Sequence, residues 1–169
     1  MLLNKKSSLV AVGGIGSALS VVLLLVATLL PAGKLAFVFV SSVIVGLLIC
    51  FGGVKAALIH YVSVALLGIL FLPDKTLALL YAVVVGNYPF VKRLVERIPS
   101  TTWRIVVKLV VFNAYMYVGY MLCILLLNID FTTGYPIAIV WICALVAFVI
   151  YDYIYMPFVY KAYDLINKI

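Results

Sequence analysis

The chain has 169 residues, of which 68% are hydrophobic and only 10% are charged. Its mean hydropathy of +1.34 lies far outside the range of soluble globular domains. The composition predicts an all-α, polytopic transmembrane helix bundle that forms a single domain over residues 1–169. The net charge of +7 does not indicate nucleic-acid binding, because the cations gather at the ends of apolar runs and not along one soluble face. The implied partner is the lipid bilayer.

Six apolar runs are candidates to cross a bilayer core, a distance that takes roughly 20 helical residues. The predicted helices cover residues 9–30, 35–51, 54–72, 76–91, 104–127 and 134–158. Residues 159–169 are expected to form a short amphipathic helix on the cytoplasmic surface. Gly52-Gly53 predicts a tight turn after the second run. Pro89 predicts a kink or break in the fourth run, because proline removes a backbone donor and disfavours helical geometry at Tyr88.

Lysine and arginine are distributed unevenly between the two sets of helix ends. With six helices and an inside N-terminus, every cation except Lys34 and Lys75 faces one side, and the densest patch lies within residues 92–108. Lys and Arg near the ends of spanning helices are retained on the cytoplasmic side. The distribution therefore predicts cytoplasmic N- and C-termini in a multi-pass protein of the cell membrane.

The first predicted helix carries a face of small residues. Gly13–Ser17 and Gly14–Ala18 are pairs of small residues four apart, a spacing that permits close approach of another helix. Two interpretations stay open: packing against the helices of this chain, and a docking face for another subunit.

Three polar residues stand inside or beside apolar runs, where such residues are functional candidates by default. His60 has no carboxylate nearby in sequence, so a hydrogen-bonded core role is favoured over a ligand role. For Asn87, a role in satisfying the carbonyls that Pro89 frees is favoured over a ligand role. For Asp152, a structural ion pair with Lys108 or Lys92 is favoured over a proton relay.

The sequence shows no catalytic or metal-binding motif. The three cysteines lie in apolar runs without a CxxC pair, and no histidine is spaced as a zinc partner. His60, Asp152 and the cysteines form no recognisable nucleophile–base or metal set. We therefore expect no enzymatic activity, no metal and no cofactor.

A stripe of polar and aromatic residues marks the fifth predicted helix. Asn113, Tyr117 and Tyr120 are spaced i, i+4 and i+7, which places them on one face, predicted to point into the bundle. Flat rings together with an amide suit a small-molecule site. Tyrosines that only pack between helices show the same spacing, so both interpretations stay open.

Six short helices, a cytoplasmic N-terminus, a small-residue face in the first helix and no catalytic motif together resemble the substrate-binding S component of an energy-coupling factor transporter. The stretches Leu30–Lys34 and Tyr88–Lys92 also resemble small bacterial membrane proteins of similar layout. The resemblance implies a subunit of the bacterial cytoplasmic membrane that binds a vitamin or small metabolite and works with a membrane coupling subunit and ATPases. The family's Ala-x-x-x-Ala docking pair would correspond to Gly14 and Ala18, with Gly where the pattern has Ala.

The family's outward-opening pocket would bring Tyr81 and Trp141 to the Asn113, Tyr117 and Tyr120 stripe. The alternative is a non-enzymatic multi-pass scaffold or partner protein of a cell-envelope complex. In that case the helices only pack, and the basic face recruits a cytoplasmic protein.

Overall fold

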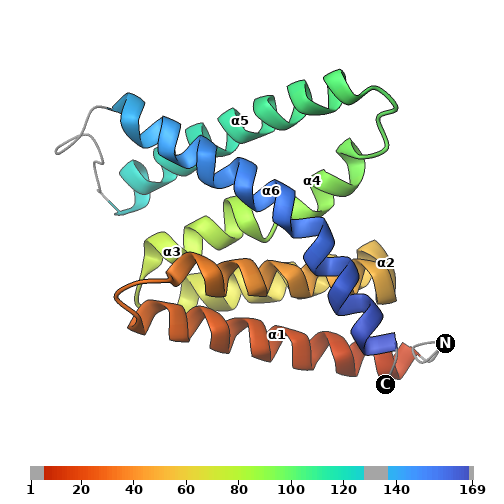
Figure 1. Cartoon of the computed structure of the whole chain (residues 1–169). Coiled ribbons are helices and arrows are strands. Elements are labelled where there is room, and N and C mark those ends of the chain that lie inside the picture. The colour runs from red at the N-terminus through yellow and green to blue at the C-terminus, as the bar shows by residue number, and fades with distance from the viewer. Residues whose placement is uncertain (1–5, 128–136, 168–169) are drawn as a thin grey trace.

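The computed structural model describes residues 6–127 and 137–167, and helices dominate this part of the chain (Figure 1). The elements are α1 (Lys6–Leu29), α2 (Lys34–Phe71), α3 (Lys75–Leu80), the π-helix η1 (Tyr81–Val85), α4 (Tyr88–Val95), α5 (Thr101–Leu127) and α6 (Ile137–Asn167). Five helical stretches in this part are long and apolar enough to cross a membrane, and α3, η1 and α4 together make one of them. The predicted class, a multi-pass bundle of apolar helices, agrees with this architecture.

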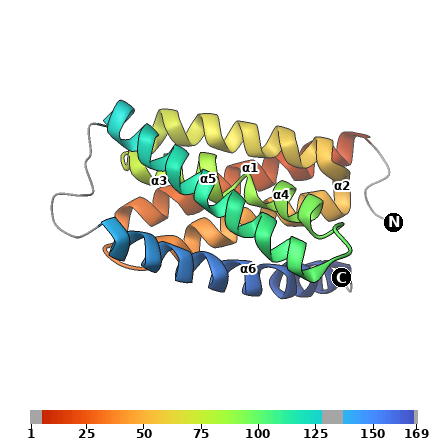
Figure 2. The ribbon, with the colours of Figure 1, turned by 90° about the horizontal axis from the view of Figure 1, so that it is seen from above.

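Helix α2 takes the place of two predicted helices. It spans 38 residues and contains one non-helical residue, Gly53, with φ of 78° and ψ of 176°. Glycine adopts a positive φ at no steric cost, so the backbone can reverse there. The two halves of α2 lie side by side and run in opposite directions (Figures 1 and 2). The expected runs 35–51 and 54–72 are these two halves, so the predicted count of six separate helices is not reproduced.

The main core lies between α1, the folded α2 and α3. Buried side chains from each of these elements and from η1 share one cluster, namely Leu24, Ala27, Val38, Val64, Leu72, Leu77, Ala78 and Tyr81. Val38 and Val64 come from opposite halves of α2, which shows that the halves meet in this core. The Ser41 hydroxyl donates a 3.3 Å hydrogen bond to the backbone oxygen of Ser20 and joins α2 to α1.

The predicted fourth helix is divided into α3, η1 and α4. Asp74 caps α3 by accepting a 3.2 Å hydrogen bond from the backbone N–H of Leu77. Pro89 stands in the first turn of α4, where its missing N–H costs no helical hydrogen bond. The expected break beside Pro89 is therefore confirmed, and it is preceded by a π-helical turn.

Tyrosines, and not Asn87, satisfy the carbonyls along this break. The Tyr61 hydroxyl donates to the Ala82 oxygen, and the Tyr151 hydroxyl donates over 3.4 Å to the Val85 oxygen. Val85, four residues before Pro89, carries the carbonyl that the proline frees, and the hydroxyl that binds it is that of Tyr151 and not an amide of Asn87. The long tyrosine side chains reach the exposed carbonyls from neighbouring helices, which the short Asn87 side chain does not.

Helix α6 runs through the position where the sequence predicts its end. It continues past Pro157 to Asn167, so residues 159–167 extend the spanning helix and do not form a separate surface helix. Packing explains the extension: Val159 and Tyr155 are buried against Val43 of α2. Farther along, the Tyr163 ring stacks on Phe51 with centroids 4.7 Å apart. These contacts hold the helix together although proline removes one of its hydrogen bonds.

The two ends of the bundle differ in charge. The start of α1, the turn at Gly53, the α4–α5 connection and the end of α6 lie at one end (Figures 1 and 2). We call this the basic end, because the cations in these segments include Lys55, Arg93, Arg97, Arg104 and Lys161. The α1–α2 and α2–α3 connections lie at the opposite end, with Lys34, Asp74 and Lys75.

Candidate functional site

A cluster of charged side chains joins α4, α5 and α6. Asp152 Oδ1 lies 2.5 Å from Lys92 Nζ, and Asp152 Oδ2 lies 2.6 Å from Lys108 Nζ. The Tyr88 hydroxyl donates a further hydrogen bond to Asp152 Oδ1. The expected ion pair with Lys108 or Lys92 thus forms with both lysines.

The ammonium group of Lys92 in this cluster is buried and surrounded by several partners. Lys92 is only 2% exposed, and its ammonium group also donates to the backbone oxygen of Asp152 and lies 3.7 Å from Glu96 Oε1. The rings of Tyr88 and Tyr155 lie 5.8 and 5.7 Å from Lys92 Nζ. A buried ammonium group is tolerated only when such partners replace its water. The cluster therefore acts as a structural tie between three helices.

His60 is enclosed by hydroxyl groups of α1. Its Nδ1 lies 2.9 Å from Ser17 Oγ, its Nε2 lies 3.4 Å from Ser20 Oγ, and the residue is 1% exposed. Ser17 donates its own proton to the Gly13 oxygen over 2.8 Å, so His60 Nδ1 is assigned as the donor to Ser17. With both ring nitrogens occupied, the geometry supports the core role and leaves no nitrogen free for a ligand.

The two small-residue pairs of α1 face different surroundings. Ser17 meets His60, and a Cβ at Gly16 would lie 3.3 Å from Ile44 Cγ2, so this side packs against α2. Gly14 and Ala18 are exposed, and a Cβ at Gly14 would meet nothing within 4 Å. The described residues therefore pack against α1 at Gly16 and Ser17, and they leave the Gly14–Ala18 side uncovered, as they do Gly13.

Two adjoining cavities lie between α3–η1 and α5–α6, with α2 as a further wall of the second, and we call them together the apolar cleft. Their volumes are about 240 and 280 Å³, and both are lined by Leu80, Val84, Tyr115 and Met116. Thr76, Tyr120, Cys123 and Trp141 extend the first cavity toward the opposite end of the bundle. Phe112, Phe148 and Tyr151 line the second. Such concave, mostly apolar spaces with few polar groups are typical of small-molecule sites.

One residue of the cleft lining carries an unsatisfied polar group. The hydroxyl oxygen of Tyr115 is buried and has no hydrogen-bond partner within the described part of the chain. Because an unpaired buried hydroxyl costs free energy, this group is suited to bind the polar atom of a ligand. Sequence reasoning missed Tyr115. The spacing of Tyr115, Gly119 and Cys123 at i, i+4 and i+8 could have indicated it, because residues with this spacing lie on one helix face. All three line the cleft.

The expected ligand residues are only partly brought together. Tyr120 and Trp141 line the cleft. Asn113 is exposed, where its amide donates to the Leu109 oxygen over 2.8 Å and accepts from Trp141 Nε1 over 3.2 Å. Tyr117 is 59% exposed, so the prediction that this stripe points into the bundle is wrong for Asn113 and Tyr117. The buried side of α5 runs one residue away, through Phe112 and Met116.

Tyr81 lies apart from the cleft lining. It is fully buried in the main core with Leu24 and Val64, and its hydroxyl has no partner among the described residues. The ligand contact that the resemblance implies for Tyr81 is therefore not part of the observed cleft.

In the part of the chain that the structure describes, no group of three or more His, Cys, Asp or Glu side chains is arranged to hold a metal ion. No protein-family model matches the sequence, and neither a curated protein nor a solved structure is significantly similar to it.

Proposed function

We propose that this chain is a membrane-embedded subunit that binds a small molecule for a transporter, in the role of an S component for uptake of a vitamin or small metabolite. The observation that carries the proposal is the apolar cleft with the buried, unpaired hydroxyl of Tyr115. Partner subunits would be a membrane coupling protein and ATPases, and the membrane would be the bacterial cytoplasmic membrane.

The cleft restricts the ligand chemistry. Its cavities of about 240 and 280 Å³ lie near the lower limit of typical ligand pockets, roughly 300–1,000 Å³. Leu80, Val84 and Met116 supply apolar walls, and the rings of Tyr120 and Trp141 supply stacking surfaces. The ligand is therefore a small, largely apolar or aromatic molecule with one hydrogen-bonding group for Tyr115.

The charge distribution supports an orientation in which this cleft opens outward. Cations gather at the basic end, which the positive-inside rule places in the cytoplasm together with both termini. Thr76 in the first turn of α3 and Val140 near the start of α6 place the first cavity toward the other end. With the two halves of α2 as separate crossings, the chain spans the membrane six times.

Cysteine labelling tests this orientation. Single cysteines at Ser100 and Pro73, two exposed residues at the two ends of the bundle, are introduced into a background without the native cysteines. We expect an impermeant thiol reagent to reach the first only from the cytoplasm and the second only from outside. Labelling of both from one side would contradict the orientation.

Ligand binding is tested on protein purified in mild detergent. Native mass spectrometry identifies a co-purified molecule, and its affinity is then compared between wild type and Tyr115→Phe. Removal of one partner of a buried hydrogen bond costs roughly 1–3 kcal/mol, or about 5- to 150-fold in affinity. Tyr117→Phe, outside the cleft, is the matched control. Absence of any ligand, or unchanged affinity in a folded Tyr115→Phe protein, would remove the support for this function.

The second candidate function is a multi-pass partner protein of a cell-envelope complex. The uncovered Gly14–Ala18 side of α1 favours a protein partner under either candidate. Replacement of both residues by leucine is expected to leave the fold intact and to detach the partner, because bulky side chains prevent close helix approach. Gly16→Leu is the control that should destabilise the protein, since Ile44 and His60 surround that position. The identity of the detached protein, transporter subunit or envelope protein, decides between the candidates.

A further inference from the structure

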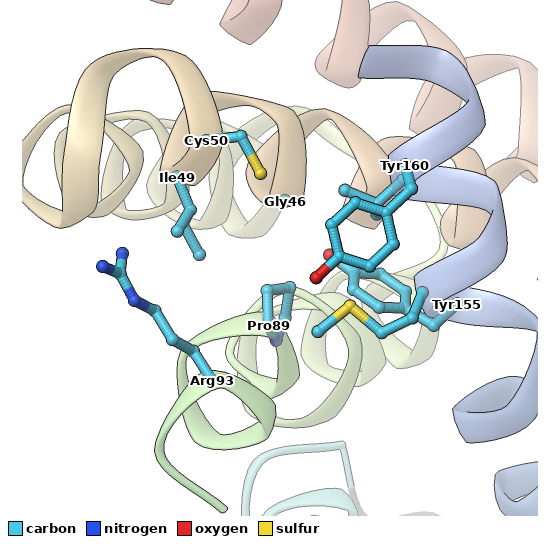
Figure 3. A pocket seen from close by; sticks show the side chains of 9 residues that line it. Gly46, Ile49, Cys50, Pro89, Arg93, Tyr155 and Tyr160 are labelled. Carbon is cyan, nitrogen blue, oxygen red and sulfur yellow. The ribbon is translucent and has the colours of Figure 1, made fainter. Parts of the chain in front are cut away.

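A third cavity of about 300 Å³ opens at the basic end, separate from the apolar cleft (Figure 3). Residues from α2, α4 and α6 line it: Gly46, Ile49, Cys50, Pro89, Arg93, Tyr155, Met156, Val159 and Tyr160. This cavity thus combines a cationic group with aliphatic side chains, and neither candidate function above involves it.

Arg93 is the unusual member of this lining. Its Nη1 is buried and has no hydrogen-bond partner within residues 6–127 and 137–167. None of the ion pairs found in that part of the chain includes Arg93, whereas the neighbouring Lys92 is held by Asp152. Because a guanidinium group presents a planar fork of donors, its natural partner is a carboxylate or a phosphate.

The surroundings of Arg93 suit a phosphate that is attached to an acyl chain. In Figure 3 the Arg93 side chain extends from α4 toward α2, and the Tyr160 hydroxyl points into the space on the other side of Pro89. Ile49, Met156 and Val159 provide apolar surface in the same cavity. Basic pockets between spanning helices at the cytoplasmic surface bind the headgroups of anionic lipids.

We propose that this cavity is a binding site for the phosphate headgroup of an anionic phospholipid. Arg93 binds the phosphate, Tyr160 donates a hydrogen bond to the headgroup, and the start of an acyl chain lies along the apolar wall. The site shares no lining residue with the small-molecule cleft, so a result that contradicts one proposal does not affect the other.

The first test uses the native cysteines. Cys50 lines the cavity and is exposed, while Cys143 is exposed elsewhere on α6 and serves as an internal reference. The detergent-purified protein is treated with N-ethylmaleimide while phosphatidylglycerol is added, and the alkylation of each thiol is followed by mass spectrometry. We expect the lipid to slow alkylation of Cys50 several-fold relative to Cys143. Equal slowing of both thiols, or no slowing, would overturn the proposal.

The second test measures retention of phosphatidylglycerol by native mass spectrometry. Arg93→Gln should weaken retention by about tenfold or more, because it removes one charge-assisted contact with the phosphate. Arg93→Lys should recover part of the loss, and Arg97→Gln, an exposed cation of the same stretch, should change little. Equal retention by Arg93→Gln and wild type would overturn the proposal.

Two further compounds, added to the protein in the same assays, distinguish a lipid phosphate from a free phosphate. Diacylglycerol, which lacks the phosphate, should not protect Cys50, and inorganic phosphate should not displace the lipid. Protection by diacylglycerol would show that the cavity only binds acyl chains. Displacement by inorganic phosphate would assign the site to a free anion. Either result would overturn the lipid assignment, and neither depends on a variant that must fold.

Discussion

Replacement of Asp152 by asparagine is expected to destabilise the protein strongly. Asp152 is the carboxylate that lies between Lys92 and Lys108, at 2.5 and 2.6 Å from their ammonium nitrogens. Its removal leaves a buried ammonium group on Lys92, whose side chain is only 3% exposed. Loss of one partner of a buried ion pair costs about 3–5 kcal/mol. Lys108 is more exposed, so the loss of its ion pair should cost less than the loss of the Lys92 pair. We therefore expect Asp152→Asn to lower the free energy of unfolding by about 3 kcal/mol.

The free energy of unfolding is measured in mixed micelles with increasing dodecyl sulfate. The matched control is Asp74→Asn, which removes the more exposed ion pair between Asp74 and Lys34. Partly exposed ion pairs contribute about 0–1 kcal/mol, and asparagine still caps α3, so this variant should lose little. The contrast between the two aspartates isolates the effect of burial.

A double variant checks the mechanism. Lys92→Met in the Asp152→Asn background removes the unpaired buried charge, and most of the lost stability should return. The reasoning is refuted if Asp152→Asn costs no more than Asp74→Asn. It is also refuted if Lys92→Met adds a further loss in the double variant, because the buried charge would then not be the cause.

Two further predictions concern packing and pH. Gly46→Ala should cost about 1–3 kcal/mol of unfolding free energy, because its Cβ would overlap the Tyr155 hydroxyl and lie 2.9 Å from Val159 Cγ2. Gly119→Ala, where nothing lies within 4 Å of the added Cβ, should lose no stability in the same assay. The hydrogen bond from Lys34 holds the pKa of the Asp74 carboxyl below its ordinary value of 3.8, so its ionised form stabilises the fold. That contribution is complete above the ordinary pKa and is lost as the pH falls through the folded value; the stability difference between wild type and Asp74→Asn should therefore shrink between about pH 6 and about pH 3. A difference that is the same at both pH values would contradict the assignment.

Several features of the fold followed from local chemistry. Apolar runs predicted the helical, membrane-spanning class, and Pro89 predicted the break before α4. Gly52-Gly53 predicted the turn at which α2 reverses, because only glycine adopts the required backbone angles freely. These predictions depend on a few neighbouring residues, so the sequence is enough to make them.

The face that each helix buries could not be predicted in the same way. Lipid tails are as apolar as the protein interior, so hydrophobic periodicity does not distinguish the inner side of α5 from the outer side. The polar pattern therefore favoured Asn113 and Tyr117, which are exposed, over Tyr115, which lines the cleft. For the same reason the sequence does not indicate which side of α1 is buried, whereas the structure buries Ser20 and exposes Ala18.

By itself the sequence determined the apolar composition of the helices, the breaks at Gly53 and beside Pro89, and the end of each helix that carries the cations. The tertiary structure decided which distant residues meet: it joins Asp152 to both Lys92 and Lys108, and it extends α6 past Pro157. The sequence could name both lysines as partners, but not choose between them, because such contacts depend on how whole helices are rotated and shifted against one another. That rotation is set by the sum of many side-chain contacts across the bundle and not by any local pattern.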